Sequence, residues 1–220
     1  NRYYTRAGQF RIDSLGYLTN AIGMNVEGYL YDASGQPTGT RGPISLSGMM
    51  APPNPTGTGV QEGTGVALAM NLSSSAEIKT FNLADPAGTS NFSSSVTVYD
   101  SLGNGHTTML YFNKTADNAW EWRAMVDGGE IAGGTPGTPV QCASGTMTFD
   151  TNGRLISSST LDNSFSFTGG ASANQQIGFN FTSTTQFDGP SVVNSLTQDG
   201  YAAGSLQSID IDQDGIITGV

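Results

Sequence analysis

The sequence predicts an all-β protein with two antiparallel β domains, one inserted into the other. Three observations support this prediction: a turn motif recurs along the chain, apolar and polar residues alternate in several segments, and no segment shows helical periodicity. A chain of 220 residues is long enough for one large or two modest domains, each with its own core.

The turn motif is an apolar or aromatic residue, then Asp, two variable residues and Gly. An Asp side chain at the start of a turn can accept a hydrogen bond from the backbone amide two residues later. The Gly three residues after the Asp can take the positive φ that closes a bulged hairpin. The motif occurs at 12–16, 31–35, 99–103, 149–153 and 211–215.

Strands are expected between these turns. Alternating apolar residues predict strands at 66–72, 120–126 and 177–181, because residues two apart share one face of a strand. Clusters of β-branched and aromatic residues predict the others, at 25–31, 44–47, 95–100, 107–114, 146–149, 154–157 and 164–168. Stretches rich in Gly, Pro, Ser and Thr predict loops at 51–65, 128–139 and 169–175.

The Pro-rich loop at 51–65 divides the chain by character. Segments before this loop and after about 184 are rich in turn motifs, whereas the middle has longer loops and more aromatic residues. We therefore expect one discontinuous domain made of 1–55 and 184–220, and an inserted domain at 56–183.

Composition excludes several partners. A formal net charge of −10 would repel nucleic acid and anionic lipid, so neither is expected to bind. Cys142 is the single cysteine, so no disulfide can form within the chain. The chain has no secretory signal pattern and no run of 18 apolar residues. Because it starts at Asn1 without Met and ends in a strand-like run, we expect a piece of a longer protein.

An acidic run near the end resembles half of a calcium-binding loop. Asp210, Asp212, Asp214 and Gly215 have the alternate spacing that such a loop uses. No flanking helices are evident, and the segment also fits the recurring turn motif. We favour a hairpin turn and expect no metal and no cofactor.

His106 and Cys142 are the candidates for catalysis. His106 is the only imidazole that could serve a Ser-His-Asp arrangement, and no G-x-S-x-G nucleophile motif is present. We expect a solvated histidine at a turn or strand edge. Cys142 has no basic neighbour closer in sequence than Arg154, so we expect a buried or incidental thiol.

Trp120 and Trp122 could form a stacking platform for sugars. However, they share one strand face with Ala124 and Val126, which is typical of a strand facing the core. The core interpretation is therefore favoured. On the opposite face, Glu121 and Arg123 are two residues apart and can pair.

Several motifs together resemble the family of bacterial flagellar hook proteins. They follow the family's order along nearly the whole chain: YTRAGQF at 4–10 with Asp13 and GYL at 16–18, SVTVYDSLGN at 95–104 followed by His106 and YFNK at 111–114, NAW at 118–120, NSLTQDGYAAGSL at 194–206 and DQDG at 212–215.

The resemblance implies a structural subunit without catalysis, part of a curved tube that joins the motor rod to the filament. The discontinuous domain would be the inner one and the insertion the outer one. The expected partners are copies of itself and other axial proteins of the rod, junction and cap. It also implies an extracellular flagellar location, reached through the flagellar export apparatus without a cleaved signal peptide.

This chain would lack the family's terminal helical segments, so the fragment alone is expected to be monomeric. Two alternatives stay open: a distal rod subunit, and a secreted carbohydrate-binding or adhesin-like module. A hydrolase would need His106.

Overall fold

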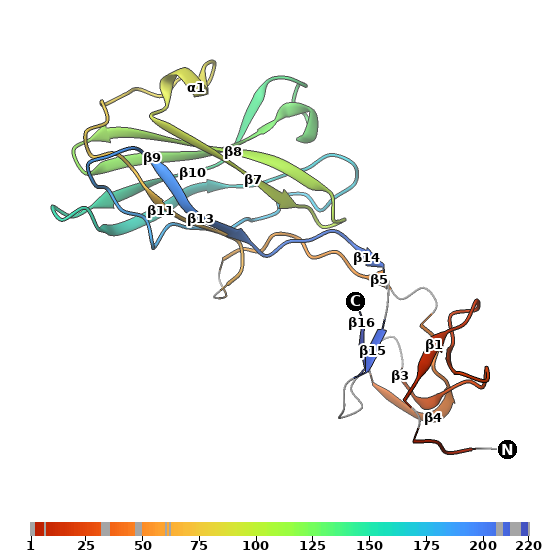
Figure 1. The fold of residues 1–220 in the computed structure, drawn as a ribbon. Coiled ribbons are helices and arrows are strands. Elements are labelled where there is room, and N and C mark those ends of the chain that lie inside the picture. Colours follow the sequence, from red (N-terminus) through yellow and green to blue (C-terminus); the bar gives the residue numbers. More distant parts are fainter. Residues whose placement is uncertain are drawn as a thin grey trace. The chain divides into compact units, whose positions relative to one another are not determined.

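The computed structural model describes residues 3–6, 8–31, 36–46, 50–59, 61, 63–205, 209–211 and 217–219. The chain forms two compact units: a smaller unit made of Asn1–Ala51 and Gly204–Val220, and a larger unit, Pro52–Ala203 (Figure 1). The predicted second boundary between the two domains lies near 184, but residues 184–203 belong to the larger unit. The physical reason is that this segment adds a strand to a sheet there.

The described residues of the larger unit form two sheets. Five strands follow one another as antiparallel neighbours: β7 (Phe92–Tyr99), β8 (Gly105–Ala116), β9 (Ala119–Asp127), β10 (Pro139–Phe149) and β11 (Leu155–Asn163). The second sheet has the order β12 (Phe179–Asn180), β6 (Val66–Asn71) and β13 (Val192–Gln198). The all-β, largely antiparallel prediction is confirmed, with one exception: β12 runs parallel to β6.

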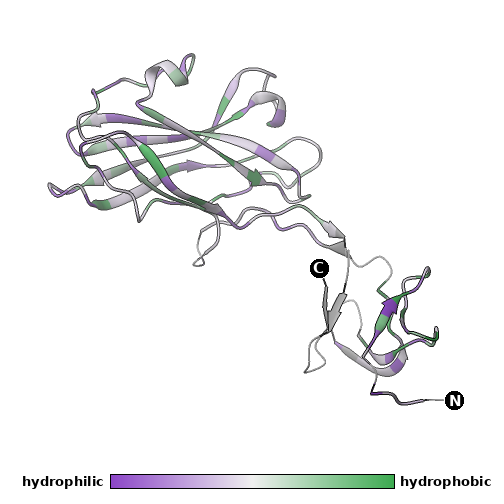
Figure 2. Cartoon of the chain, in the orientation of Figure 1, coloured by the Kyte–Doolittle hydropathy of each residue, from purple (hydrophilic) through white to green (hydrophobic). Residues whose placement is uncertain are grey.

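Side chains from both sheets form one core, as in a β-sandwich. Val66, Leu68 and Met70 alternate inward from β6, which gives the strand its buried and half-buried pattern. Figure 2 shows apolar and polar residues interleaved along the strands of this unit. The alternation therefore places one face of each sheet against the other.

Gly145 on β10 marks the closest approach in this core. It pairs with Trp122 of β9, and a Cβ atom at this position would lie 2.5 Å from the indole Nε1. The same Cβ would lie 1.9 Å from the Ser159 carbonyl oxygen on β11. Only glycine leaves room for the indole and the neighbouring strand together.

The connections contain little helix. Residues 72–91 link β6 to β7 and include a single turn, α1 (Pro86–Thr89), whose N-cap Asp85 accepts a 3.0 Å hydrogen bond from the Gly88 amide. A 3-10 turn, η1 (Gly128–Glu130), follows β9. Among the described residues, no helix is long and apolar enough to span a membrane.

The smaller unit consists of antiparallel strand pairs. They are β1 (Phe10–Ile12) with β2 (Leu18–Asn20), β3 (Glu27–Tyr31) with β4 (Pro37–Pro43), β5 (Met50–Ala51) with β14 (Gly204–Ser205), and β15 (Ile209–Ile211) with β16 (Ile217–Gly219). Leu18 is fully buried here.

Some strand predictions differ from the structure. The segments expected at 44–47 and 164–168 form isolated bridges at Ser45, Phe165 and Phe167 instead of strands. The expected strand 177–181 is reduced to β12. Each of these segments has the right residue types, but a ladder needs a continuous partner strand.

Candidate functional site

Three turns of the recurring motif lie among the described residues, and all have the expected geometry. Asp13, Asp100 and Asp150 each accept hydrogen bonds from the amides two and four residues later, at 2.8–2.9 Å. The closing glycines have φ of 82°, 84° and 74°. A fourth turn uses Asn20 in place of Asp, with Gly23 at φ 81°. The turn residues 32–35 and 212–215 lie outside the described part of the chain.

Asp100 differs from its counterparts because it is fully buried. Its Oδ1 accepts from the two turn amides. Its Oδ2 accepts from Asn104 Nδ2 at 2.9 Å and lies 3.2 Å from His106 Nε2. Burial by itself raises the pKa of Asp100, but hydrogen bonds from Asn104, His106 and the backbone outweigh it, so the pKa is lowered. The turn carboxylate therefore also anchors the start of β8.

His106 lies between two carboxylates. Its Nδ1 is 2.7 Å from Glu130 Oε2, opposite the contact with Asp100, and its ring stacks on Phe167 with centroids 3.8 Å apart. The side chain is largely buried, so the expectation of a solvated histidine is wrong. Both ring nitrogens face carboxylates, and neither is left to activate a nucleophile. The cluster joins the 99–103 turn, η1 and the core.

The two segments by which the chain enters and leaves the larger unit are held to each other. The first crossing is 52–57 and the second is 198–203. Asn54 forms an antiparallel bridge with Tyr201, and the Asp199 carbonyl accepts a 3.0 Å hydrogen bond from Asn54 Nδ2. The Asp199 carboxylate accepts from the amides of Gly57 (3.0 Å) and Gly65 (2.8 Å).

Thr56 connects the crossings to the turn at 99–103. Its hydroxyl accepts from the Tyr99 amide at 2.8 Å and donates to Gln198 Oε1 at 3.1 Å. Gln175 Nε2 donates to the carbonyls of both Thr56 and Tyr99. We call Thr56, Tyr99, Gln175, Gln198 and Asp199 the crossing clamp. Its hydrogen bonds join residues that are far apart in sequence, and they tie both crossings to β7.

Replacing Asp199 with alanine should loosen the clamp. The substitution leaves the amides of Gly57 and Gly65 without an acceptor, which costs about 1–3 kcal/mol for each donor that stays buried. Amide hydrogen exchange at Gly57 and Gly65 is expected to accelerate more than exchange in β9. Asp117→Ala is the matched control, because this side chain is 95% exposed and its ion pair with Lys114 Nζ is long, at 3.8 Å. Unchanged exchange at both glycines would contradict this role for Asp199.

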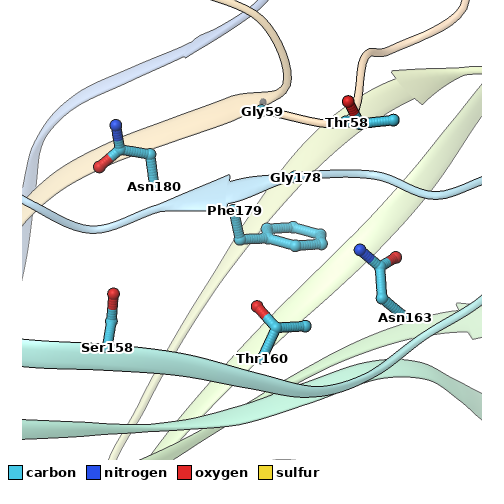
Figure 3. Close-up of a pocket in the computed structure, with 8 residues that line it drawn as sticks. All are labelled: Thr58, Gly59, Ser158, Thr160, Asn163, Gly178, Phe179 and Asn180. Atoms are coloured by element: carbon cyan, nitrogen blue, oxygen red, sulfur yellow. The ribbon is translucent and has the colours of Figure 1, made fainter. Parts of the chain in front are cut away.

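An open cavity of about 300 Å³ lies between β11 and β12. Ser158, Thr160 and Asn163 line it from β11, with Phe179 and Asn180 from β12 (Figure 3). The loop residues Thr58, Gly59 and Gly178 complete the lining. These groups can donate and accept hydrogen bonds, but none is ionisable, so the cavity has no acid, base or nucleophile activated by a charge.

The remaining candidates are structural. Trp120 and Trp122 are each 1% exposed, which confirms the core interpretation and leaves neither ring free for sugars. Glu121 and Arg123 pair at 2.7 Å. Cys142 is buried, and burial raises the pKa of its thiol to about 11, so the thiolate is scarce at neutral pH.

In the part of the chain that the structure describes, no group of three or more His, Cys, Asp or Glu side chains is placed to hold a metal ion. Asp210 lies in β15, opposite Thr218 of β16. Asp212, Asp214 and Gly215 lie outside the described residues, so the hairpin interpretation of this segment stays a prediction.

These features define a class of protein: an antiparallel β-sandwich whose acidic, histidine and aromatic side chains hold turns, crossings and core in place. Comparison with known proteins identifies the family. Residues 70–201 match the family described as flagellar basal body protein FlaE D2 domain. The chain belongs to this FlgE D2 domain family.

The relatives are hook proteins. The chain is 33% identical to the flagellar hook protein FlgE of Salmonella typhimurium, over 99% of this chain and 52% of that protein. It is 30% identical to FlgE of Escherichia coli K12 with the same coverage. The chain thus spans about half the length of these relatives. The crystal structure of Helicobacter pylori hook protein FlgE2 has a similar fold, with a TM-score of 0.53, 12% identity, and coverage of 98% of this chain and 78% of that one.

Proposed function

We propose that this chain is part of a structural subunit of the bacterial flagellar hook, the curved tube that links the motor rod to the filament. The observation that carries the proposal is the 33% identity to a hook protein over 99% of the chain. A distal rod role and a sugar-binding role have less support, since the relatives are named hook proteins and both tryptophans are buried.

The distribution of charge suits a subunit whose contacts must slide as a joint bends. Only 12% of residues are charged. Several of these groups are engaged within the larger unit: Asp100 and Glu130 with His106, Asp199 with two amides, and Glu121 with Arg123. Gly, Ser, Thr and Asn are abundant in the chain, a composition that favours wet interfaces over large apolar ones.

We further propose that the smaller unit is the inner domain and the larger unit the outer one. The partners would be copies of the same chain together with axial proteins of the rod, junction and cap. The location would be the extracellular flagellum, and export would use the flagellar apparatus without a cleaved signal peptide. No catalysis is proposed.

Electron microscopy tests the proposal. The full-length gene product that contains this chain is expected to polymerise into curved hollow tubes, whereas the 220-residue chain alone stays monomeric by light scattering. Deleting the gene should leave cells without hooks and without swimming, and the full-length protein should restore both. Soluble monomers from the full-length protein, with hooks intact in the deletion strain, would rule the proposal out.

A further inference from the structure

We propose that the outer edge of β11 is a docking surface for a second copy of this chain. This inference rests on the proposed hook function and names a surface for its self-assembly. β11 is the terminal strand of the five-stranded sheet, with β10 as its strand partner among the described residues. Three features support this surface: the bulges of β11, the absence of charge at 155–161, and the cavity beside the strand.

Two bulges expose the large aliphatic residues of this strand. Thr148 pairs with Ser157 and Phe149 with Leu155, so Ile156 is the extra residue of the first bulge. By the same register, Leu161 is the extra residue of the second, between Thr160 and Asp162. Ile156 is 68% exposed and Leu161 is 69% exposed. Bulges redirect side chains, and here both direct an aliphatic group into solvent.

The edge between these residues carries no protective charge. Exposed edge strands can pair with other chains and are usually shielded by Lys, Pro, inward-pointing charges or β-bulges. Residues 155–161 contain no charged residue and no Pro, so the two bulges are the shielding features here, and four consecutive hydroxyl residues occupy 157–160. Two of them, Ser157 and Ser159, bond across to Thr148 and Thr146 of β10. Asp162, just beyond, is engaged by the Ser144 hydroxyl at 3.0 Å.

The cavity beside β11 offers a receptor for a protruding side chain. Ser158 and Thr160 of the same strand line it, opposite Asn180, with the Phe179 ring between the strands (Figure 3). At about 300 Å³, it can accept one large side chain and hydrogen-bond a polar tip. Along β11, the cavity-lining residues Ser158 and Thr160 lie between the exposed residues Ile156 and Leu161.

The uncharged edge allows a second copy of this acidic chain to be the occupant. Two chains with a net charge of −10 repel each other unless they meet through uncharged surfaces, and 155–161 is such a surface. In a tube, the edge must meet a different surface of the next copy, because β11 against β11 would close after two subunits. The contact is therefore heterologous.

Photo-crosslinking in assembled hooks tests the surface directly. The full-length protein would carry p-benzoylphenylalanine at Ile156 or Leu161, and irradiation should give covalent dimers whose linked peptide lies outside β11 of the partner copy. Absence of dimers in intact hooks, a link between two β11 strands, or a link to another protein would overturn the inference. Failure of the unmodified protein to form hooks would instead refute the proposed function.

A double variant gives a second readout. Ile156→Ser with Leu161→Ser should weaken association between copies by roughly tenfold or more, seen as a higher critical concentration for tube formation. The matched control is Ile78→Ser with Leu83→Ser, which removes side chains 61% and 52% exposed elsewhere on the larger unit. Melting temperatures of both variants should stay close to wild type. An unchanged critical concentration in the β11 variant would overturn the inference.

Discussion

Replacing Trp122 with alanine is expected to lower the free energy of unfolding of the larger unit by about 3–5 kcal/mol. The indole is 1% exposed and lies 5.0 Å from the Phe179 ring and 5.1 Å from the Phe181 ring. Its Nε1 donates to the Ser159 carbonyl at 3.3 Å, so truncation also removes the hydrogen bond that β9 donates to this oxygen of β11. Few neighbours can move into the space, because Gly145 supplies only backbone there.

Urea unfolding of the 220-residue chain, followed by far-UV circular dichroism, measures this loss. Tyr201→Ala is the matched aromatic control in the same unit, because its ring is 52% exposed and its truncation should cost about 1 kcal/mol or less. A loss below about 1 kcal/mol for Trp122→Ala would mean that the ring contributes little to the stability of the core. The wild-type chain is expected to bind no sugar on a glycan array, so Trp122→Ala should leave the array signal unchanged.

Local chemistry explains what the sequence could predict. The turns at Asp13, Asp100 and Asp150 depend on one side chain and amides within four residues, so the motif alone specifies them. The inward face of β9 follows from the period of two at Trp120 and Trp122. Both features are decided within about ten residues of sequence.

Long-range pairing explains what the sequence could not predict. Asp199 accepts from amides 134 and 142 positions away, and no local pattern marks it as a clamp residue. For the same reason, residues 184–203 could not be assigned to the larger unit. β11 was only partly predicted because its two bulges interrupt the alternation that identifies a strand.

The His106 cluster shows the same limit at a single residue. A lone histidine after Asn104 and Gly105 suggests a solvated turn, and its two carboxylates come from different places. Asp100 is local, but Glu130 lies 24 positions away and Phe167 further still. An acidic residue in the recurring turn, followed closely by the only histidine, was the one signal that could have indicated a buried pair.

Replacing Asp100 with alanine is expected to cost about 3–5 kcal/mol, because it removes the carboxylate that faces Nε2 of buried His106 together with the acceptor of three hydrogen bonds in the turn. Asp150→Ala is the matched control. Both substitutions remove one carboxylate that accepts from two turn amides, but only Asp100 also contacts the side chains of Asn104 and His106. Asp150→Ala should cost about 1–2 kcal/mol, and equal losses would show that the buried contacts contribute nothing.

The penalty for Asp100→Ala should also depend on pH, in a direction that the lowered pKa of Asp100 fixes. A carboxyl whose pKa is lower in the folded chain than in the unfolded chain stabilises the fold above its unfolded value, near 4. That contribution is lost as the pH falls through the folded value, because both states are then protonated. The difference in unfolding free energy between wild type and Asp100→Ala, measured in urea from pH 7 to pH 2, should therefore be full at neutral pH and shrink below about 4. A penalty that stays constant across this range would mean that the charge of Asp100 is not what holds the turn, Asn104 and His106 together.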